Sequence, residues 1–164
     1  MKLAEFLFAM EHIAPKELAM GFDNVGLLIG TERTEIKRVL LALDCTTATA
    51  QEAIDWGADL LLTHHPLFLS GIKRILPDDT ATAGAYLLLR NGIAHYAAHT
   101  NLDAAPGGVN DCLAEALGIL DAIPLPPDQL GRIGNRSAET PASLGAFAAF
   151  VADRLKTAVR ICGA

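Results

Sequence analysis

The sequence predicts an α/β fold in which helices cover a mainly parallel sheet. Short apolar runs, typical of strands that are buried on both faces, recur along the chain. Segments with the apolar spacing of amphipathic helices separate these runs, and glycines stand at several of the boundaries. Strands that alternate with helices favour parallel pairing, because two parallel strands need a crossover connection between them.

The elements up to residue 118 follow this alternation closely. Thr46 supplies a hydroxyl that can cap the helix that follows it, and Gly57 is suited to end that helix. Gly92 and Gly118 are expected to end two later helices in the same way. In chain order we expect a helix over 2–12, strands over 25–30 and 38–45, a helix over 46–57, a strand over 58–65, a helix over 80–92, a strand over 93–99 and a helix over 109–118.

The remainder of the chain is less regular. A proline-rich connection over 121–129 precedes a short strand near Ile133. A helix is expected to begin at Thr140, with Pro141 at its first position, where the missing N–H does no harm. A last strand is predicted over 158–162. The length of 164 residues favours a single domain with one core.

The charge balance argues against generic binding of nucleic acid. The formal net charge is -6, and the lysines and arginines are scattered instead of gathered on one face. Nucleic-acid binding relies on concentrated positive charge that replaces counterions on phosphate. The N-terminal apolar patch is broken by Glu5 and Glu11, so neither a signal peptide nor a membrane span is expected.

The cysteines indicate a reducing compartment. Their number is odd and no C-x-x-C pair occurs, so we expect free thiols and a cytoplasmic location. The three positions are Cys45, Cys112 and Cys162.

Two adjacent histidines, His64 and His65, end an apolar run at a place where turn-forming residues would be usual. Asp44 ends the preceding strand, and His99 and Asp103 follow the next one. Right-handed crossovers bring the carboxyl ends of parallel strands to one edge of a sheet, where ligands bind in open α/β folds. Imidazole with carboxylate suits Zn, Mn, Fe, Co or Ni better than Ca. The sequence therefore predicts a metal site at this edge.

Each of these residues also has a structural interpretation. The adjacent histidines could be solvated surface residues, and Asp103 could simply begin the turn over 103–108. His99 could be a hydrogen-bonded histidine at a strand end, and Asp44 could hold an imidazole without touching a metal.

A nucleophilic site is the main chemical alternative. Cys45 or Thr63 beside His64 could form a nucleophile and base pair. The spacing gives this no support, since no nucleophile-elbow or phosphate-loop motif occurs.

Three stretches resemble the signature segments of the Nif-three-like family, whose members are also called GTP cyclohydrolase I type 2 homologues. They are FDNVGLLIG over 22–30, LLTHHPLFLSGIKRI over 61–75 and AAHTNLDAAPGGVNDCLAEALG over 97–118. Their order and spacing match over roughly residues 1–135. The resemblance implies a three-layer α/β fold, two divalent metal ions and a ring-like homo-oligomer, often a hexamer.

The same resemblance implies roles for individual residues. His64, His65 and Asp103 would be metal ligands, with Asp103 bridging the two ions. His99 would line the same pocket.

One feature departs from the family pattern. Members complete the site with a histidine and a glutamate from an H-x-x-x-E segment near the C-terminus, and no such segment follows residue 135. We therefore expect an N-terminal metal-site domain over 1–135 and the truncated start of a second α/β unit over 136–164. A natural short protein that closes on an edge strand is the alternative.

Two classes of function are compatible with these residues. The first is a metal-dependent hydrolase, GTP cyclohydrolase-like, that acts on a nucleotide-like or phosphate-bearing small molecule. The second is a non-catalytic metal-binding protein with an interaction or regulatory role. The sequence does not separate them, because function depends on details of a site that a fold does not determine.

Overall fold

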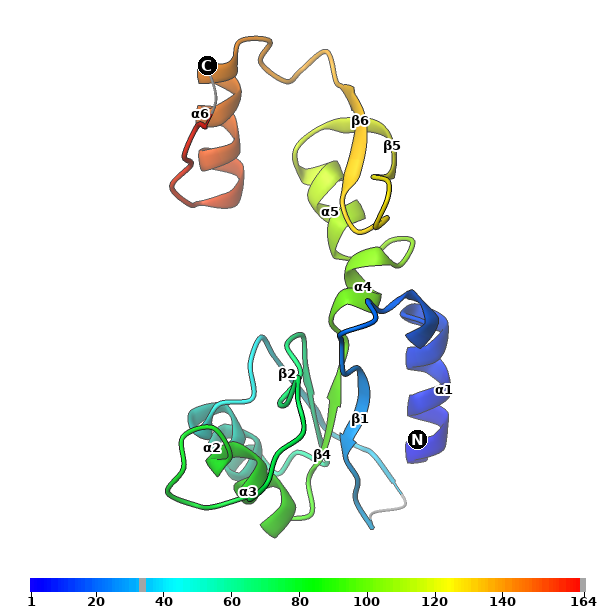
Figure 1. Ribbon diagram of the computed structural model, residues 1–164, viewed down its shortest axis with the longest axis vertical. Coiled ribbons are helices and arrows are strands. Elements are labelled where there is room, and N and C mark those ends of the chain that lie inside the picture. Colours follow the sequence, from blue (N-terminus) through cyan, green and yellow to red (C-terminus); the bar gives the residue numbers. More distant parts are fainter. Residues whose placement is uncertain (33–34, 163–164) are drawn as a thin grey trace. The chain divides into compact units, whose positions relative to one another are not determined.

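The computed structural model describes residues 1–32 and 35–162, and the chain forms two compact units (Figure 1). We call Met1–Ala105 the N-terminal unit and Pro106–Ala164 the C-terminal unit. The predicted domains, 1–135 and 136–164, stay a prediction, and the last two residues of the second lie outside the described residues.

A four-stranded sheet forms the centre of the N-terminal unit, with the strand order β1-β4-β3-β2. Three strands are parallel to one another, and β1 pairs antiparallel with β4 at one edge. This arrangement confirms the mainly parallel sheet. The strands are β1 (Gly26–Ile29), β2 (Val39–Ala42), β3 (Leu60–Thr63) and β4 (Ala94–Ala97).

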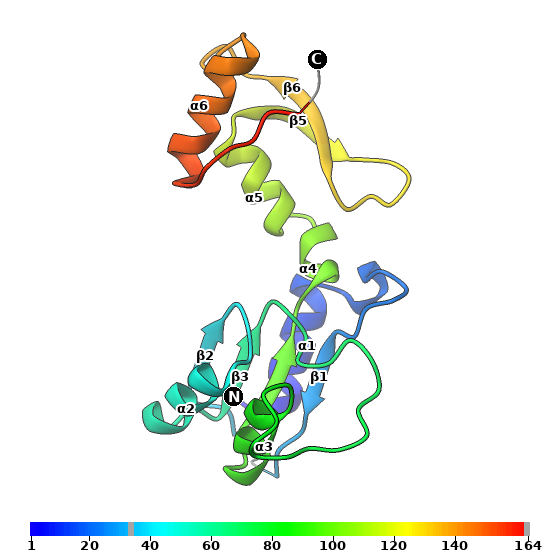
Figure 2. The ribbon, with the colours of Figure 1, turned by 60° about the vertical axis from the view of Figure 1, so that its left-hand side comes forward.

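Helices cover both faces of this sheet and so give it three layers (Figure 2). Buried residues of α2 (Thr47–Trp56) and α3 (Ala83–Arg90) pack with Leu61 on one face. Phe6 and Met10 of α1 (Leu3–Ile13) pack with Leu60 on the other face. Neighbouring residues of a strand point to opposite faces, which explains why these strands read as continuous apolar runs.

The helix signals in the sequence act as predicted in α2. The Thr46 hydroxyl accepts a hydrogen bond from the Thr49 N–H at 3.1 Å and so caps the helix. Gly57 ends it in the left-handed conformation, with φ 71°, which glycine adopts without a steric penalty. Two short helices were not predicted, a 3-10 turn at Lys16–Leu18 and α4 at Thr100–Ala104.

The C-terminal unit contains α5 (Val109–Ala116), the antiparallel pair β5 (Ile119–Pro124) and β6 (Arg132–Arg136), and α6 (Leu144–Leu155). The strand expected near Ile133 and the helix over 109–118 are confirmed. The start of the expected connection over 121–129 instead lies in β5, because its backbone pairs with β6.

Two further expectations for this unit were wrong. The helix expected from Thr140 begins at Leu144, because Thr140 is buried and donates its hydroxyl to the Ser137 carbonyl in a turn. The Ser143 hydroxyl caps α6 instead. No strand forms over 158–162, where the backbone pairs with no other strand within the described part of the chain.

Among the described residues, no helix is long and apolar enough to cross a membrane.

Candidate metal centre

The three parallel strands deliver the predicted residues to one edge of the sheet in the N-terminal unit. Asp44 follows the end of β2, and His64 and His65 come directly after β3. His99 lies at the start of α4, and Asp103 lies one turn further along that helix. The structure therefore brings together the side chains whose convergence the strand order predicted.

Three histidines form a compact cluster at this edge. One ligand nitrogen from each of His64, His65 and His99 lies within 4.8 Å of the others. Their ring centroids are 5.1 to 5.5 Å apart. Among the described residues, no other group of three or more histidine, cysteine or acidic side chains meets at such distances.

Two of the imidazoles are held by carboxylates on their far side. His65 Nδ1 lies 2.7 Å from an Asp44 oxygen, and His99 Nδ1 lies 3.0 Å from an Asp23 oxygen. A carboxylate accepts hydrogen bonds, so each Nδ1 donates its hydrogen. In a neutral ring the other nitrogen, Nε2, then carries the free lone pair. A carboxylate behind an imidazole is the usual support of a metal-ligating histidine.

His64 is oriented in the same sense by the backbone. Its Nδ1 lies 3.0 Å from the Ala98 carbonyl oxygen, which can only accept, so the hydrogen again sits on Nδ1. Its Nε2 lies 3.6 Å from an Asp103 oxygen. That separation is too long for a good hydrogen bond, but an ion about 2.0 to 2.2 Å from each atom would fit between them.

Asp23 is a residue of this site that sequence reasoning did not single out. Its side chain is fully buried and receives hydrogen bonds from the Thr100 hydroxyl and backbone N–H and from the Asn24 N–H. Burial alone would raise the pKa of this carboxyl, but the hydrogen bonds from Thr100 and His99 lower it below its usual value. Its only sequence signal is its place in the stretch over 22–30.

Asp103 lies within the short helix α4. Leu102 and Asp103 donate their backbone N–H groups to the His99 carbonyl, so Asp103 belongs to a helical turn. The Asn101 side chain accepts from the His99 N–H and donates to the Ala14 carbonyl, which anchors the start of the helix in the unit.

The nucleophilic alternative receives no support from the geometry. Burial raises the pKa of the Cys45 thiol to about 12, which disfavours the thiolate that would attack a substrate. The Thr63 hydroxyl is buried and donates to the His65 carbonyl at 2.7 Å. It therefore does not stand beside the His64 ring as an activated nucleophile would.

Two open cavities lie beside the carboxylates of Asp44 and Asp23, which hold His65 and His99. One, of about 490 Å³, lies beside Asp44 and His65 and extends to the first residues of α2. The other, of about 430 Å³, lies beside Asp23 and the loop that carries Phe68 and Ile72. Both volumes are in the range of small-molecule sites.

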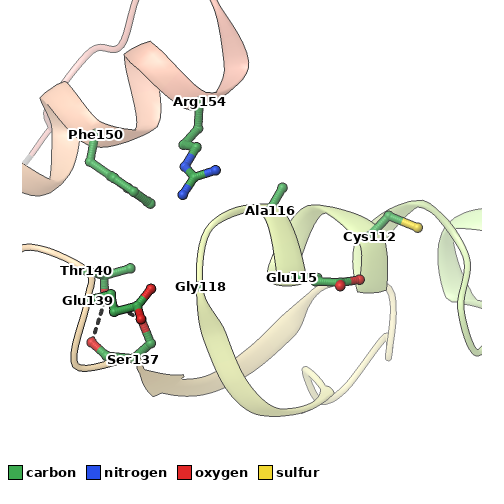
Figure 3. Close-up of a pocket in the computed structure, with 9 residues that line it drawn as sticks. All are labelled: Cys112, Glu115, Ala116, Gly118, Ser137, Glu139, Thr140, Phe150 and Arg154. Carbon is green, nitrogen blue, oxygen red and sulfur yellow. Dashed lines mark hydrogen bonds between the residues drawn. The ribbon is translucent and has the colours of Figure 1, made fainter.

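A further cavity, of about 560 Å³, lies in the C-terminal unit. Figure 3 shows Phe150 and Arg154 on one side of it and Ser137, Glu139 and Thr140 on the other. Arg154 lies 5.2 Å from the centre of the Phe150 ring, a cation–π distance. No histidine lines this cavity, so we place the candidate metal centre in the N-terminal unit.

Comparison with known proteins gives a consistent result. The model of the Duf34/NIF3 (NGG1p interacting factor 3) family matches residues 1–164. A protein of Clostridium perfringens named GTP cyclohydrolase 1 type 2 homolog is 42% identical over 139 residues, which are 81% of this chain and 53% of that protein. The chain spans about half the length of two of the curated relatives that it matches and about a third of others.

Two solved structures share the fold. A Bacillus cereus protein related to NIF3 is 41% identical, with a TM-score of 0.71 over 77% of this chain and 35% of that one. Reduced HcgD from Methanocaldococcus jannaschii is 34% identical, with a TM-score of 0.82 over 93% of this chain and 60% of that one.

Proposed function

This chain belongs to the Duf34/NIF3 family. We propose that its N-terminal unit binds two divalent metal ions and that these ions form the active site of a hydrolase. The substrate class that we propose is a nucleotide-like or phosphate-bearing small molecule. One observation carries the proposal. Three imidazoles at one sheet edge each donate a hydrogen bond from Nδ1 to an oxygen, which leaves the lone pair of Nε2 free to bind a metal ion.

The donor set fits a borderline divalent ion. Imidazole nitrogen combined with carboxylate oxygen is common in sites for Zn, Fe, Mn, Co or Ni. We assign His64, His65 and Asp103 as ligands and His99 as the next donor, since its nitrogen lies in the same cluster. Two ions that share these side chains would each keep open positions, as catalytic sites do.

The surrounding residues would hold these donors in place. Bound divalent ions supply Lewis acidity and lower the pKa of water. Asp44 and Asp23 keep the rings of His65 and His99 in the tautomer that presents Nε2. The cavity beside His65 and the cavity beside Asp23 leave room for a substrate near these residues.

The names of relatives support this class of reaction only in outline. "GTP cyclohydrolase 1 type 2 homolog" suggests a guanine nucleotide as the first substrate to test. The homo-oligomer, a hexamer, that the sequence resemblance implies stays a proposal for the whole protein.

A second function is favoured by the name of the family itself. "NGG1p interacting factor 3" describes a protein that acts through a partner. In that case the same metal site would hold the sheet edge in shape for binding, and no turnover would depend on the ion. Metal binding alone therefore does not decide between the two functions.

Measurement of metal content and turnover on one preparation tests both points. Protein loaded with zinc, manganese or iron would be dialysed, analysed by mass spectrometry for metal, and assayed with GTP and a panel of phosphoesters. His65→Ala should lose both metal and turnover, whereas Glu139→Ala in the C-terminal unit should lose neither. Bound metal without turnover of any substrate would favour the interaction protein.

Replacement of Asp103 tests its assignment as the bridging ligand. Asp103→Ala should remove most of the bound metal, because both ions would lose a donor. Equal metal content in the wild type and in Asp103→Ala would show that Asp103 does not bind the ions. Asp153→Ala, an exposed aspartate of α6, is the control for the loss of one acidic residue.

A further inference from the structure

A buried hydrogen-bond relay lies beneath the candidate metal centre. The His95 ring is fully buried in the middle of β4, and its Nε2 lies 2.8 Å from the Thr63 hydroxyl. That hydroxyl in turn lies 2.7 Å from the His65 carbonyl oxygen. The chain of contacts therefore joins a core residue to the backbone of a proposed ligand.

The direction of each hydrogen bond follows from what the atoms can do. The His65 carbonyl can only accept, so the Thr63 hydroxyl donates its single hydrogen to that carbonyl oxygen. The Thr63 oxygen must then accept from His95, which places the His95 hydrogen on Nε2. Burial lowers the pKa of His95 to about 4, so the ring stays neutral around pH 7 and keeps this tautomer.

The presence of a histidine at position 95 has a cost. Its other nitrogen, Nδ1, is buried without a hydrogen-bond partner among the described residues, and a buried polar atom without a partner is unfavourable. The opposing residues on the two neighbouring strands are Leu61 and Ile29. An aliphatic side chain would fill the same space without that cost. The hydrogen bond to Thr63 is therefore what a histidine provides here and an aliphatic residue would not.

From this geometry we infer that His95 and Thr63 are positioning residues for the metal centre, acting through the backbone of His65. The relay fixes the carbonyl of His65 and so the turn in which His64 and His65 leave β3. Since Asp44 already holds the His65 ring, backbone and side chain are restrained from two sides. This inference rests on the proposed metal site and adds residues that touch neither the metal nor the substrate.

Substitutions of Thr63 separate this role from simple packing. Thr63→Val keeps the shape of the side chain but removes the hydroxyl, and Thr63→Ser keeps the hydroxyl. We expect Thr63→Val to weaken zinc binding by about 10-fold, at the low end for groups that support a metal ligand. Thr63→Ser should restore affinity to within about 2-fold of the wild type.

Two readouts besides activity make the test decisive. Zinc dissociation constants would be measured by competition with a chelator on protein shown to be folded by circular dichroism. The visible absorption of Co²⁺-loaded protein would report the geometry of the ligands. Thr63→Val should shift the Co²⁺ bands, and Thr63→Ser should not. His95→Gln, which can still donate to Thr63, should resemble the wild type more closely than His95→Leu does.

The outcomes distinguish the two levels of the argument. Failure of the wild type to bind zinc or Co²⁺ would overturn the proposed metal site and this inference with it. A wild type that binds metal, with unchanged affinity and spectrum in folded Thr63→Val, would overturn the positioning role and leave the metal site standing. Equal losses in Thr63→Val and Thr63→Ser would also contradict the relay, because only one of them lacks the hydroxyl.

Discussion

The two compact units of this chain differ in how completely they bury their apolar residues. In the N-terminal unit Leu60, Leu61 and Leu88 are fully buried between the sheet and its helices. In the C-terminal unit, among the described residues, only the small side chain of Ala114 belongs to the buried apolar set. The large apolar side chains of Ile123 and Leu144 are 60% and 63% exposed.

This contrast indicates where a functional site can be rigid. A ligand set must be held by side chains and backbone that packing prevents from moving. The histidine cluster follows directly after strands β3 and β4. Residues of these strands contribute to the apolar clusters on the two faces of the sheet. No α6 residue within the described part of the chain is buried, so the cavity beside α6 has weakly packed walls. The comparison therefore favours the N-terminal unit as the site of metal chemistry.

The largest expected effect is a difference in the loss of unfolding free energy when one large side chain is truncated in each unit. Leu61→Ala removes a fully buried side chain and should lower the free energy of unfolding by about 2 to 5 kcal/mol. Ile123→Ala removes a mostly exposed one and should cost less than about 1 kcal/mol. Urea unfolding followed by circular dichroism measures both values. Similar losses would contradict the contrast between the units.

The pH dependence of stability should sharpen the comparison, because all five histidines lie in the N-terminal unit. Burial lowers the pKa of His95 from 6.5 to about 4. Between these values the unfolded chain binds a proton that the folded chain does not, so stability falls as pH falls through this window. At about 1.4 kcal/mol per pKa unit the loss is at most about 3.5 kcal/mol.

The control for this prediction is His95→Gln, which cannot titrate. Metal-free wild type and variant would be unfolded with urea at several pH values between 4 and 7. The difference between their unfolding free energies should change with pH in the stated direction. A constant difference across the window would mean that His95 does not titrate as its burial predicts.

A smaller effect is expected from the carboxylate behind His65. Asp44→Asn should weaken zinc binding by about 10-fold, the low end for such partners, because this carboxylate is half exposed. Glu139→Gln in the C-terminal unit should leave zinc affinity unchanged. Isothermal titration of both variants with zinc measures the difference. Equal zinc affinity in Asp44→Asn and the wild type would show that Asp44 does not support His65 as a metal ligand.

Much of the N-terminal unit could be predicted from the sequence because its signals are local. The apolar runs of β3 and β4 and the Thr46 cap with Gly57 each act within a few residues, and the structure has each of these elements. The meeting of His64, His65 and His99 followed from strand order, a rule that needs no side-chain detail.

The errors arose where structure depends on distant residues. The burial of Asp23 beside His99 joins positions far apart in the sequence, and no local pattern announces it. The start of α6 is an exception, because the turn that Thr140 makes with Ser137 joins residues only three positions apart. At 158–162 an apolar run predicts a strand, but a strand also needs a partner backbone, and none within the described residues pairs with this segment.

A zinc titration followed by ¹⁵N NMR of the histidine rings tests the proposed metal centre directly. We expect the Nε2 signals of His64, His65 and His99 to move to the range of metal-bound nitrogen, while each Nδ1 keeps its hydrogen. His12 and His95 should not respond, since neither belongs to the cluster of three ligand side chains and the His95 ring is also buried in the core. Unchanged Nε2 signals from all three clustered histidines at saturating zinc would contradict the metal centre.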